Sequence, residues 1–179
     1  MNSLRLSAGV LAQLGEMPPT LRALLDSEWA LLALLGVFVL EGAMLMYFMP
    51  SELIVPGSLL VLGTDSLVPV LAVAVLGATV GQYALFLVAK RGGRAYLEEK
   101  RWFRISPEKL DRFDRWFDRW GPVAVPVSNA LLFTRGMLTV PAGFAEMDDR
   151  QFLLYSAAGT LVFEAALAAL YLAGSSLLF

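Results

Sequence analysis

The sequence predicts an all-α polytopic membrane protein, with an inverted-repeat arrangement of two opposed re-entrant hairpins and several spanning helices. Apolar residues make up 58% of the 179 residues, and the mean hydropathy is +0.65. Soluble domains are only about 45–50% apolar even when glycine is counted. Three apolar stretches are long enough to cross about 30 Å of hydrocarbon. Two others are interrupted by prolines, which predicts hairpins that enter the membrane and turn back.

The sequence contains neither cysteine nor histidine, which limits the catalytic and metal-binding sites that it can form. This excludes disulfides, thiol nucleophiles, Ser-His-Asp triads and the common zinc sites, and no standard glycine-rich phosphate loop occurs. We therefore predict no metal, no cofactor and no enzymatic activity, with an intramembrane lipid phosphatase as a distant alternative. Basic and acidic residues are too mixed to indicate binding to nucleic acid.

The first 27 residues predict an amphipathic segment that lies at the membrane interface. A cleaved signal peptide is the alternative interpretation. Gln13 and Glu16 interrupt its short apolar stretch, and a small-residue cleavage site is missing. We expect one membrane domain to follow, over residues 28–179.

The first apolar stretch, Trp29–Met49, holds one carboxylate, Glu41. A charge inside a bilayer costs on the order of 2.5–3.5 kcal/mol by insertion scales, so chains that keep one usually use it. Pro50-Ser51-Glu52 follows, and Pro56-Gly57 interrupts the next apolar residues. Prolines this close together break a continuous helix. We therefore expect the first re-entrant region at about residues 41–64.

The next stretch, Leu67–Ala89, is the clearest spanning helix because it carries no charge. Gly77 and Gly81 are four residues apart, a spacing that lets another helix pack closely. The basic cluster Lys90-Arg91-Gly92-Gly93-Arg94 follows directly and predicts that this end is cytoplasmic.

Ten of the fourteen Lys and Arg residues fall between Lys90 and Arg119. Within this segment, Ser106-Pro107-Glu108 predicts the start of a helix over about residues 106–120. Aromatic residues at helical spacing on one face and arginines on the other predict that this helix lies in the cytoplasmic interface. The charges are explained by a solvated face, or alternatively by attraction to anionic lipid headgroups.

The second half repeats the same pattern. The apolar region 121–145 is interrupted by prolines and contains Asn129 and Arg135, which predicts the second re-entrant region. A long apolar tract, Gln151–Phe179, follows and contains Glu164. In each half, a charged and proline-broken stretch precedes a spanning helix.

Each half is also expected to turn at a Pro-Gly motif, Pro56-Gly57 in the first half and Pro141-Ala142-Gly143 in the second. Inverted-repeat transporters have this layout and place their substrate site where the two broken elements meet near the midplane. We therefore expect the ionisable residues of the two hairpins to come together there.

Four motifs, in this order and spacing, make the chain resemble the DedA family, also called the SNARE-associated Golgi or VTT-domain family. The resemblance runs from about Leu40 to Gly174. The motifs are Leu40-Glu41 with Pro50-Ser51-Glu52 and Pro56-Gly57; Gly77-Ala78-Thr79-Val80-Gly81-Gln82-Tyr83 with Lys90-Arg91-Gly92-Gly93; Phe133-Thr134-Arg135 with Val140-Pro141-Ala142-Gly143; and Phe152, Gly159 and the final small-residue helix.

The resemblance implies two opposed re-entrant hairpins and a role in moving lipids across a bilayer. It also implies that the functional residues are the acids at positions 41 and 52, here Glu41 and Glu52, and a pair of arginines in the second hairpin. Here only Arg135 is present, and Asn129 stands where the other arginine is expected. Two further positions differ from the family pattern. Gln82 follows the second glycine, where an acid or amide is usual, and Phe163-Glu164 stands where a Trp-Asn pair is common in the last helix.

We therefore predict a substrate or proton pathway formed by Glu41, Glu52, Arg135 and Glu164. Gln82 and Asn129 are expected to support it, and the hairpin breakers are predicted to be Pro50, Pro56, Gly57, Pro141 and Gly143. A guanidinium offers paired donors that match a phosphate. A carboxylate would occupy Arg135 until a phosphate displaces it, and the released acid would then take a proton.

A structural interpretation of each charge stays open at this point. Glu41 and Glu164 could be packing residues, and Arg135 could form an ion pair that only fixes the hairpins. At the level of function, the leading prediction is a flippase or scramblase of the cell membrane that moves a polyprenyl phosphate or a phospholipid. The alternatives are a proton-coupled carrier of small ions or drugs and a non-transporting scaffold. The expected partners are lipid phosphate headgroups and protons, and homo-oligomerisation stays open.

Overall fold

The computed structural model describes residues 29–45, 51–99, 111, 115 and 117–178. These residues form helices and turns without any strand, which confirms the all-α prediction. The elements are α3 (Ala30–Gly42), η1 (Ser51–Leu53), α4 (Ile54–Leu62), η2 (Thr64–Ser66), α5 (Leu67–Glu99), η3 (Gly121–Val123), α7 (Ala124–Ala130), α8 (Thr139–Phe144) and α9 (Asp149–Leu178).

Three predictions fall partly or wholly outside the described residues. The N-terminal segment 1–27 and Pro50 lie outside them. So does most of the predicted interfacial helix 106–120, of which residues 111, 115 and 117–120 are described and helical.

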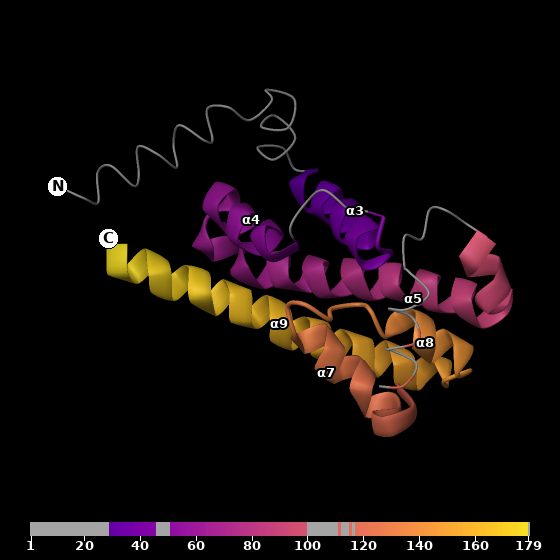
Figure 1. Cartoon of the computed structure of the whole chain (residues 1–179). Coiled ribbons are helices and arrows are strands. Elements are labelled where there is room, and N and C mark those ends of the chain that lie inside the picture. Colours follow the sequence, from indigo (N-terminus) through magenta and orange to yellow (C-terminus); the bar gives the residue numbers. More distant parts are fainter. Residues whose placement is uncertain (1–28, 46–50, 100–110, 112–114, 116, 179) are drawn as a thin grey trace.

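The two longest described helices, α5 and α9, pack against each other and run antiparallel (Figure 1). They contain 33 and 30 residues. Thr64–Gly92 and Asp149–Ser175 are long and apolar enough to cross a membrane by length and composition. The aromatic rings of Phe86 on α5 and Phe152 on α9 stack 4.2 Å apart at the seam between them.

The short helix α3 packs closely against α5 because two glycines of α5 leave room for its backbone. A Cβ atom at Gly77 would lie 2.6 Å from the Cβ of Phe38, and one at Gly81 would overlap the carbonyl oxygen of Val39. The Gly77 and Gly81 spacing therefore serves helix packing, as the sequence predicts. This packing brings the end of α3 alongside the middle of α5.

Helix α3 is shorter than the 21-residue span expected for Trp29–Met49. It ends at Gly42, and Met44 then adopts a left-handed φ of 58°. A 13-residue helix is about 20 Å long, which is less than the hydrocarbon thickness. The chain therefore leaves the helix one residue after Glu41, and residues 43 and 44 form a turn.

The turns also differ from those expected at the proline motifs. Pro56 and Gly57 lie inside α4, and Pro141 and Gly143 lie inside α8. Each proline is the third residue of its helix, where a backbone N–H has no partner within the helix, so neither proline breaks it. In the second hairpin the left-handed turn residue is instead Gly136, with a φ of 71°.

Each half of the described chain contains short helices followed by one long helix. In the first half α3 and α4 precede α5, and in the second half α7 and α8 precede α9. This order matches the pattern seen in the sequence. The inverted relation between the halves, and the entry of the hairpins into a membrane, stay predictions.

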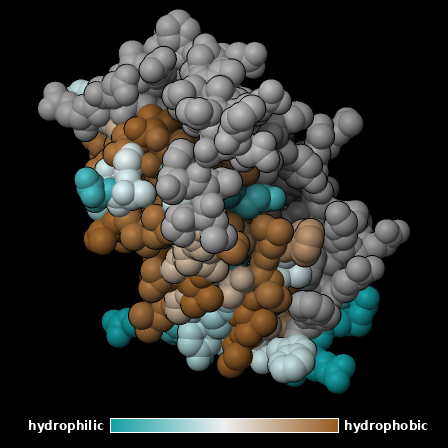
Figure 2. Space-filling view, turned by 90° about the vertical axis from the view of Figure 1, so that its left-hand side faces the viewer, coloured by the Kyte–Doolittle hydropathy of each residue, from teal (hydrophilic) through white to brown (hydrophobic). Residues whose placement is uncertain are grey.

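Large apolar side chains cover much of the outer surface, as the brown areas of Figure 2 show for one face. Phe133, Val68 and Leu170 are 85%, 74% and 70% exposed. The described interior holds three apolar clusters: one around Phe86 and Phe152, one around Phe38 and α4, and a smaller one of Leu85, Ala89 and Val140. A chain that is apolar both inside and outside is suited to a lipid surrounding.

Candidate functional site

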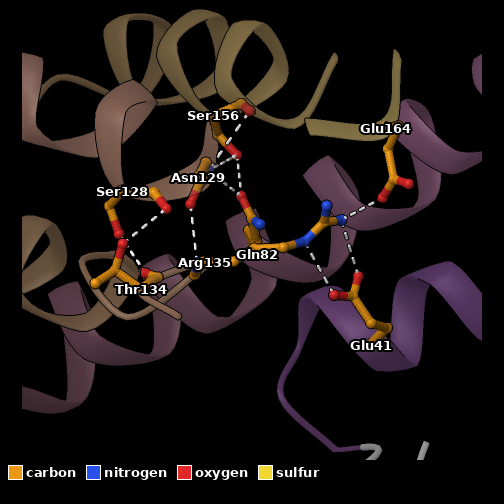
Figure 3. Close-up of polar contacts among 9 residues, drawn as sticks. Glu41, Gln82, Ser128, Asn129, Thr134, Arg135, Ser156 and Glu164 are labelled. Atoms are coloured by element: carbon orange, nitrogen blue, oxygen red, sulfur yellow. Dashed lines mark hydrogen bonds and ion pairs between the residues drawn. The ribbon is translucent and has the colours of Figure 1, made fainter. Parts of the chain in front are cut away.

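The centre of the candidate site is an ion pair between Arg135 and Glu41, residues from separate halves of the chain (Figure 3). Arg135 lies in the turn between α7 and α8, and Glu41 is the second-last residue of α3. Nε of Arg135 donates to Oε1 of Glu41 at 3.1 Å, and Nη2 donates to Oε2 at 3.3 Å. This two-point contact is the geometry in which a guanidinium binds a carboxylate or a phosphate most specifically.

A second carboxylate, Glu164 of α9, approaches the same guanidinium. Its Oε1 lies 2.7 Å from Nη2 of Arg135, which makes a second ion pair to this cation. No described residue donates a hydrogen bond to either oxygen of Glu164, and its side chain is 0% exposed. Glu164 therefore depends on Arg135 to compensate its charge.

The guanidinium of Arg135 is buried, but not all of its N–H donors have an acceptor among the described residues. The ring of Phe163 lies 4.3 Å from Cζ and covers one face, an arrangement that favours a cation. Only 5% of the Arg135 side chain is exposed. Nη1 is buried and has no acceptor among the described residues. Glu41 and Glu164 thus share one cation, and the Nη1 group of Arg135 has hydrogen-bond donors that no described residue accepts.

A network of uncharged polar side chains lies next to Arg135 and joins three elements. The amide nitrogen of Asn129 on α7 donates to Oε1 of Gln82 on α5 at 2.7 Å. The hydroxyl of Ser156 on α9 donates to the same oxygen. All three side chains are buried. The network thus ties the start of the second hairpin to both long helices.

The same network fixes the turn that carries Arg135. Oδ1 of Asn129 accepts a hydrogen bond from the backbone N–H of Gly136 at 3.0 Å. Thr134 donates to the carbonyl oxygen of Ser128 at 3.2 Å, and the Ser128 hydroxyl donates to the Thr134 carbonyl oxygen. The residues on both sides of Arg135 are therefore held to α7.

The sequence predicts Asn129 and Gln82 as supporting residues of the site, but three members of this network were not predicted. These are Ser128, Thr134 and Ser156. Ser156 lies eight residues before Glu164, two helical turns along the same face. A polar residue at this spacing within an apolar tract was a usable signal.

The remaining predicted site residues form no described hydrogen bond or ion pair with Arg135. Glu52 is partly buried in η1, and the described ion pairs of Arg135 are with Glu41 and Glu164 instead. Pro56 is partly buried in α4, and Pro141 is buried in α8. A Cβ atom at Gly143 would lie 2.6 Å from the Cβ of Ala89, so this glycine allows α8 to pack on α5. The geometry thus unites three of the four predicted ionisable residues.

A second polar cluster joins the far end of α5 to the start of α9. Nζ of Lys90 lies 2.6 Å from Oδ1 of Asp149 and donates to the carbonyl oxygen of Met147 at 2.8 Å. The Tyr83 hydroxyl donates to Oδ2 of Asp149 at 3.0 Å. The side chains of Lys90 and Asp149 are 28% and 43% exposed. This partly exposed cluster links α5 to α9 and shares no described residue with the Arg135 site.

Comparison with known proteins decides the family. The sequence matches the VTT domain over residues 27–172, most of the chain. The chain belongs to the DedA family of VTT-domain membrane proteins. This DedA protein is 30% identical to the uncharacterized membrane protein YkoX of Bacillus subtilis (strain 168) over 128 residues, which are 70% of the chain and 57% of that relative. The family assignment from the sequence motifs is therefore confirmed.

Two other relatives carry functional names. Undecaprenyl phosphate transporter A of Bacillus subtilis (strain 168) is 25% identical over 108 residues, which are 59% of the chain and 54% of that relative. An alkaline phosphatase-like protein of Lactococcus lactis subsp. cremoris (strain MG1363) is 25% identical over 129 residues, 68% of the chain and 60% of that relative. The chain thus spans less than two thirds of each of these relatives, and no solved structure matches it.

Proposed function

We propose that this DedA protein moves a phosphate-bearing lipid, a polyprenyl phosphate or a phospholipid, across the membrane, and that Arg135 holds the phosphate. The observation that carries the proposal is the buried guanidinium of Arg135, which faces two carboxylates and whose Nη1 has no acceptor within the described part of the chain. A permanent cation in an apolar protein is costly unless a partner uses it. The relative named undecaprenyl phosphate transporter A supports this substrate class.

The geometry favours an exchange between the phosphate and Glu41. The Nε and Nη2 donors that face Glu41 form the edge of the guanidinium that also matches two phosphate oxygens. Glu41 lies at the end of α3, and its side chain is 11% exposed. A phosphate that takes this edge releases Glu41, and the released carboxylate is the candidate proton carrier of a coupled transport cycle. Lipid tails would stay on the apolar outer surface while the headgroup occupies the site.

The test uses the purified protein in liposomes with a labelled polyprenyl phosphate, a labelled phospholipid and a labelled polyprenol that lacks the phosphate. We expect the protein to equilibrate one of the two phosphate lipids between leaflets and not the polyprenol. Arg135→Ala should abolish this movement and Glu41→Gln should slow it at least tenfold. Glu146→Gln is the matched control, because Glu146 is exposed on the turn after α8. Unchanged movement in both site variants would refute the proposal.

The same liposomes separate the alternatives. Movement of a pH-sensitive or drug-like dye without movement of either lipid would favour a small-ion or drug carrier, and no movement at all would favour a scaffold. Two relatives are named alkaline phosphatase-like proteins, so released inorganic phosphate is measured as well. We expect none, because phosphate-ester hydrolysis commonly uses a nucleophile or metal ligands of types that this sequence lacks.

If the released Glu41 takes a proton, the movement is coupled to the proton gradient. We expect lipid movement to accelerate when a pH gradient is imposed across the liposome and to lose that acceleration in Glu41→Gln. A wild-type rate that is the same with and without the gradient would show that transport of the lipid proceeds without proton coupling.

A further inference from the structure

We propose that Glu164 is a positioning residue: it stays paired with Arg135 when a phosphate displaces Glu41, and it thereby limits how tightly the site holds that phosphate. The inference rests on the proposed function of Arg135. It concerns a carboxylate that the exchange between Glu41 and phosphate does not use.

The two carboxylates on Arg135 differ in how easily each can leave. Glu41 lies at the end of a 13-residue helix, directly before the turn in which Met44 has a φ of 58°. Glu164 lies in the middle of the 30-residue helix α9, with a side chain that is 0% exposed. The Glu41 side chain is 11% exposed and can therefore move outward, whereas the Glu164 side chain is fully enclosed.

Separation from Arg135 would also leave Glu164 without compensation. No described residue donates a hydrogen bond to its oxygens, and Arg135 is the cation 2.7 Å away. An unpaired buried carboxylate is strongly unfavourable. Arg135 is correspondingly anchored by Glu164 on one side and by the Phe163 ring on its face. The contact with Glu164 thus outlasts the contact with Glu41.

A retained Glu164 changes the charge that a phosphate meets. With Glu41 in place, the site holds one cation and two carboxylates. After the exchange it holds one cation, Glu164 and a phosphate monoester, which carries a charge of about −1.5 to −2 near pH 7. The repulsion from Glu164 is therefore larger in the phosphate-bound site than in the free site. This repulsion weakens binding, as a carrier that must release its cargo requires.

The test measures binding and movement separately, with farnesyl monophosphate as a soluble probe and farnesol as its uncharged counterpart. Glu164→Gln keeps the side-chain shape and removes the charge. We expect it to bind farnesyl monophosphate roughly tenfold more tightly and to move labelled polyprenyl phosphate several times more slowly, because release becomes limiting. Farnesol binding should not change. Glu164→Asp keeps the charge, so its affinity should stay within about twofold of the wild type.

Glu146→Gln again serves as the charge-matched control, and thermal unfolding in detergent verifies that each variant is folded. Weaker or unchanged binding in a folded Glu164→Gln protein would overturn the role of Glu164. If Glu164→Gln fails to fold, Glu164→Asp decides: the inference requires near-normal affinity, and a large loss of affinity would indicate a packing role. If the wild-type protein and Arg135→Ala bind the probe equally, the proposed function itself fails.

Discussion

The side-chain oxygen of Asn129 accepts a hydrogen bond from the backbone N–H of Gly136, 3.0 Å away. This bond connects the two ends of the segment that contains Arg135 and closes it against α7. The amide nitrogen of Asn129 points the other way, to Gln82 on α5. One buried side chain therefore fixes the turn and locates it relative to the first half of the protein (Figure 3).

Replacing Asn129 should misplace Arg135. Asn129→Leu leaves the buried Gly136 N–H without its acceptor, which costs about 1–3 kcal/mol. It also leaves the Ser156 hydroxyl as the remaining described donor to Oε1 of Gln82. We expect a lower melting temperature in detergent and a loss of lipid movement of at least tenfold. Asn129→Asp keeps an acceptor for Gly136 and should retain more activity than Asn129→Leu. Equal, wild-type-like movement in both variants would contradict the positioning role.

Removing Arg135 should destabilise the protein through Glu164. Arg135→Leu leaves a fully buried carboxylate without its cation, a change that costs about 3–5 kcal/mol. The double variant Arg135→Leu/Glu164→Leu removes both charges and should recover most of this loss, although neither variant should transport. The Glu41 side chain keeps 11% of its area exposed, so its charge should need less compensation than that of the fully enclosed Glu164. Thermal unfolding in detergent measures both variants, and a double variant no more stable than the single one would be inconsistent with this account.

The packing of α3 on α5 should depend on Gly81. Gly81→Ala places a methyl group against the backbone of Val39 and Ala43, and overpacking of this kind costs about 1–3 kcal/mol. The matched control is Gly36→Ala on the exposed side of α3, where a Cβ atom meets nothing within 4 Å. It should be neutral or stabilising by about 0.5–1 kcal/mol. Chemical or thermal unfolding of the two variants gives the comparison.

Two phenylalanines of opposite exposure test the interior of the second half. Phe86 is 0% exposed and stacks on Phe152, so Phe86→Ala should cost about 3–5 kcal/mol. Phe133 is 85% exposed near Arg135 in the sequence, and Phe133→Ala should change stability by less than about 0.5 kcal/mol. Similar melting temperatures for both variants would show that the seam between α5 and α9 is not a packed core.

Much of this architecture could be predicted because it follows from composition and spacing. The length and apolarity of Leu67–Ala89 predict a helix that the structure confirms within α5. Gly77 and Gly81 predict the close packing that α3 provides. The proline motifs were less informative, since Pro56 and Pro141 each fit the first turn of a helix, where the missing N–H costs no hydrogen bond. A proline in a sequence does not reveal whether it ends a helix or begins one.

The sequence by itself determined the membrane family, the helical class and the presence of costly charges in apolar stretches, because these depend only on residue type and local order. Tertiary structure alone decided which charges meet. Arg135 and Glu41 are 94 residues apart in the chain, and their contact depends on where α3 stops and on how the Asn129 network closes the second turn. Glu164 also pairs with Arg135, whereas the described ion pairs of Arg135 do not include Glu52. Contacts between residues so far apart in the sequence are set by the packing of whole helices and not by any local pattern.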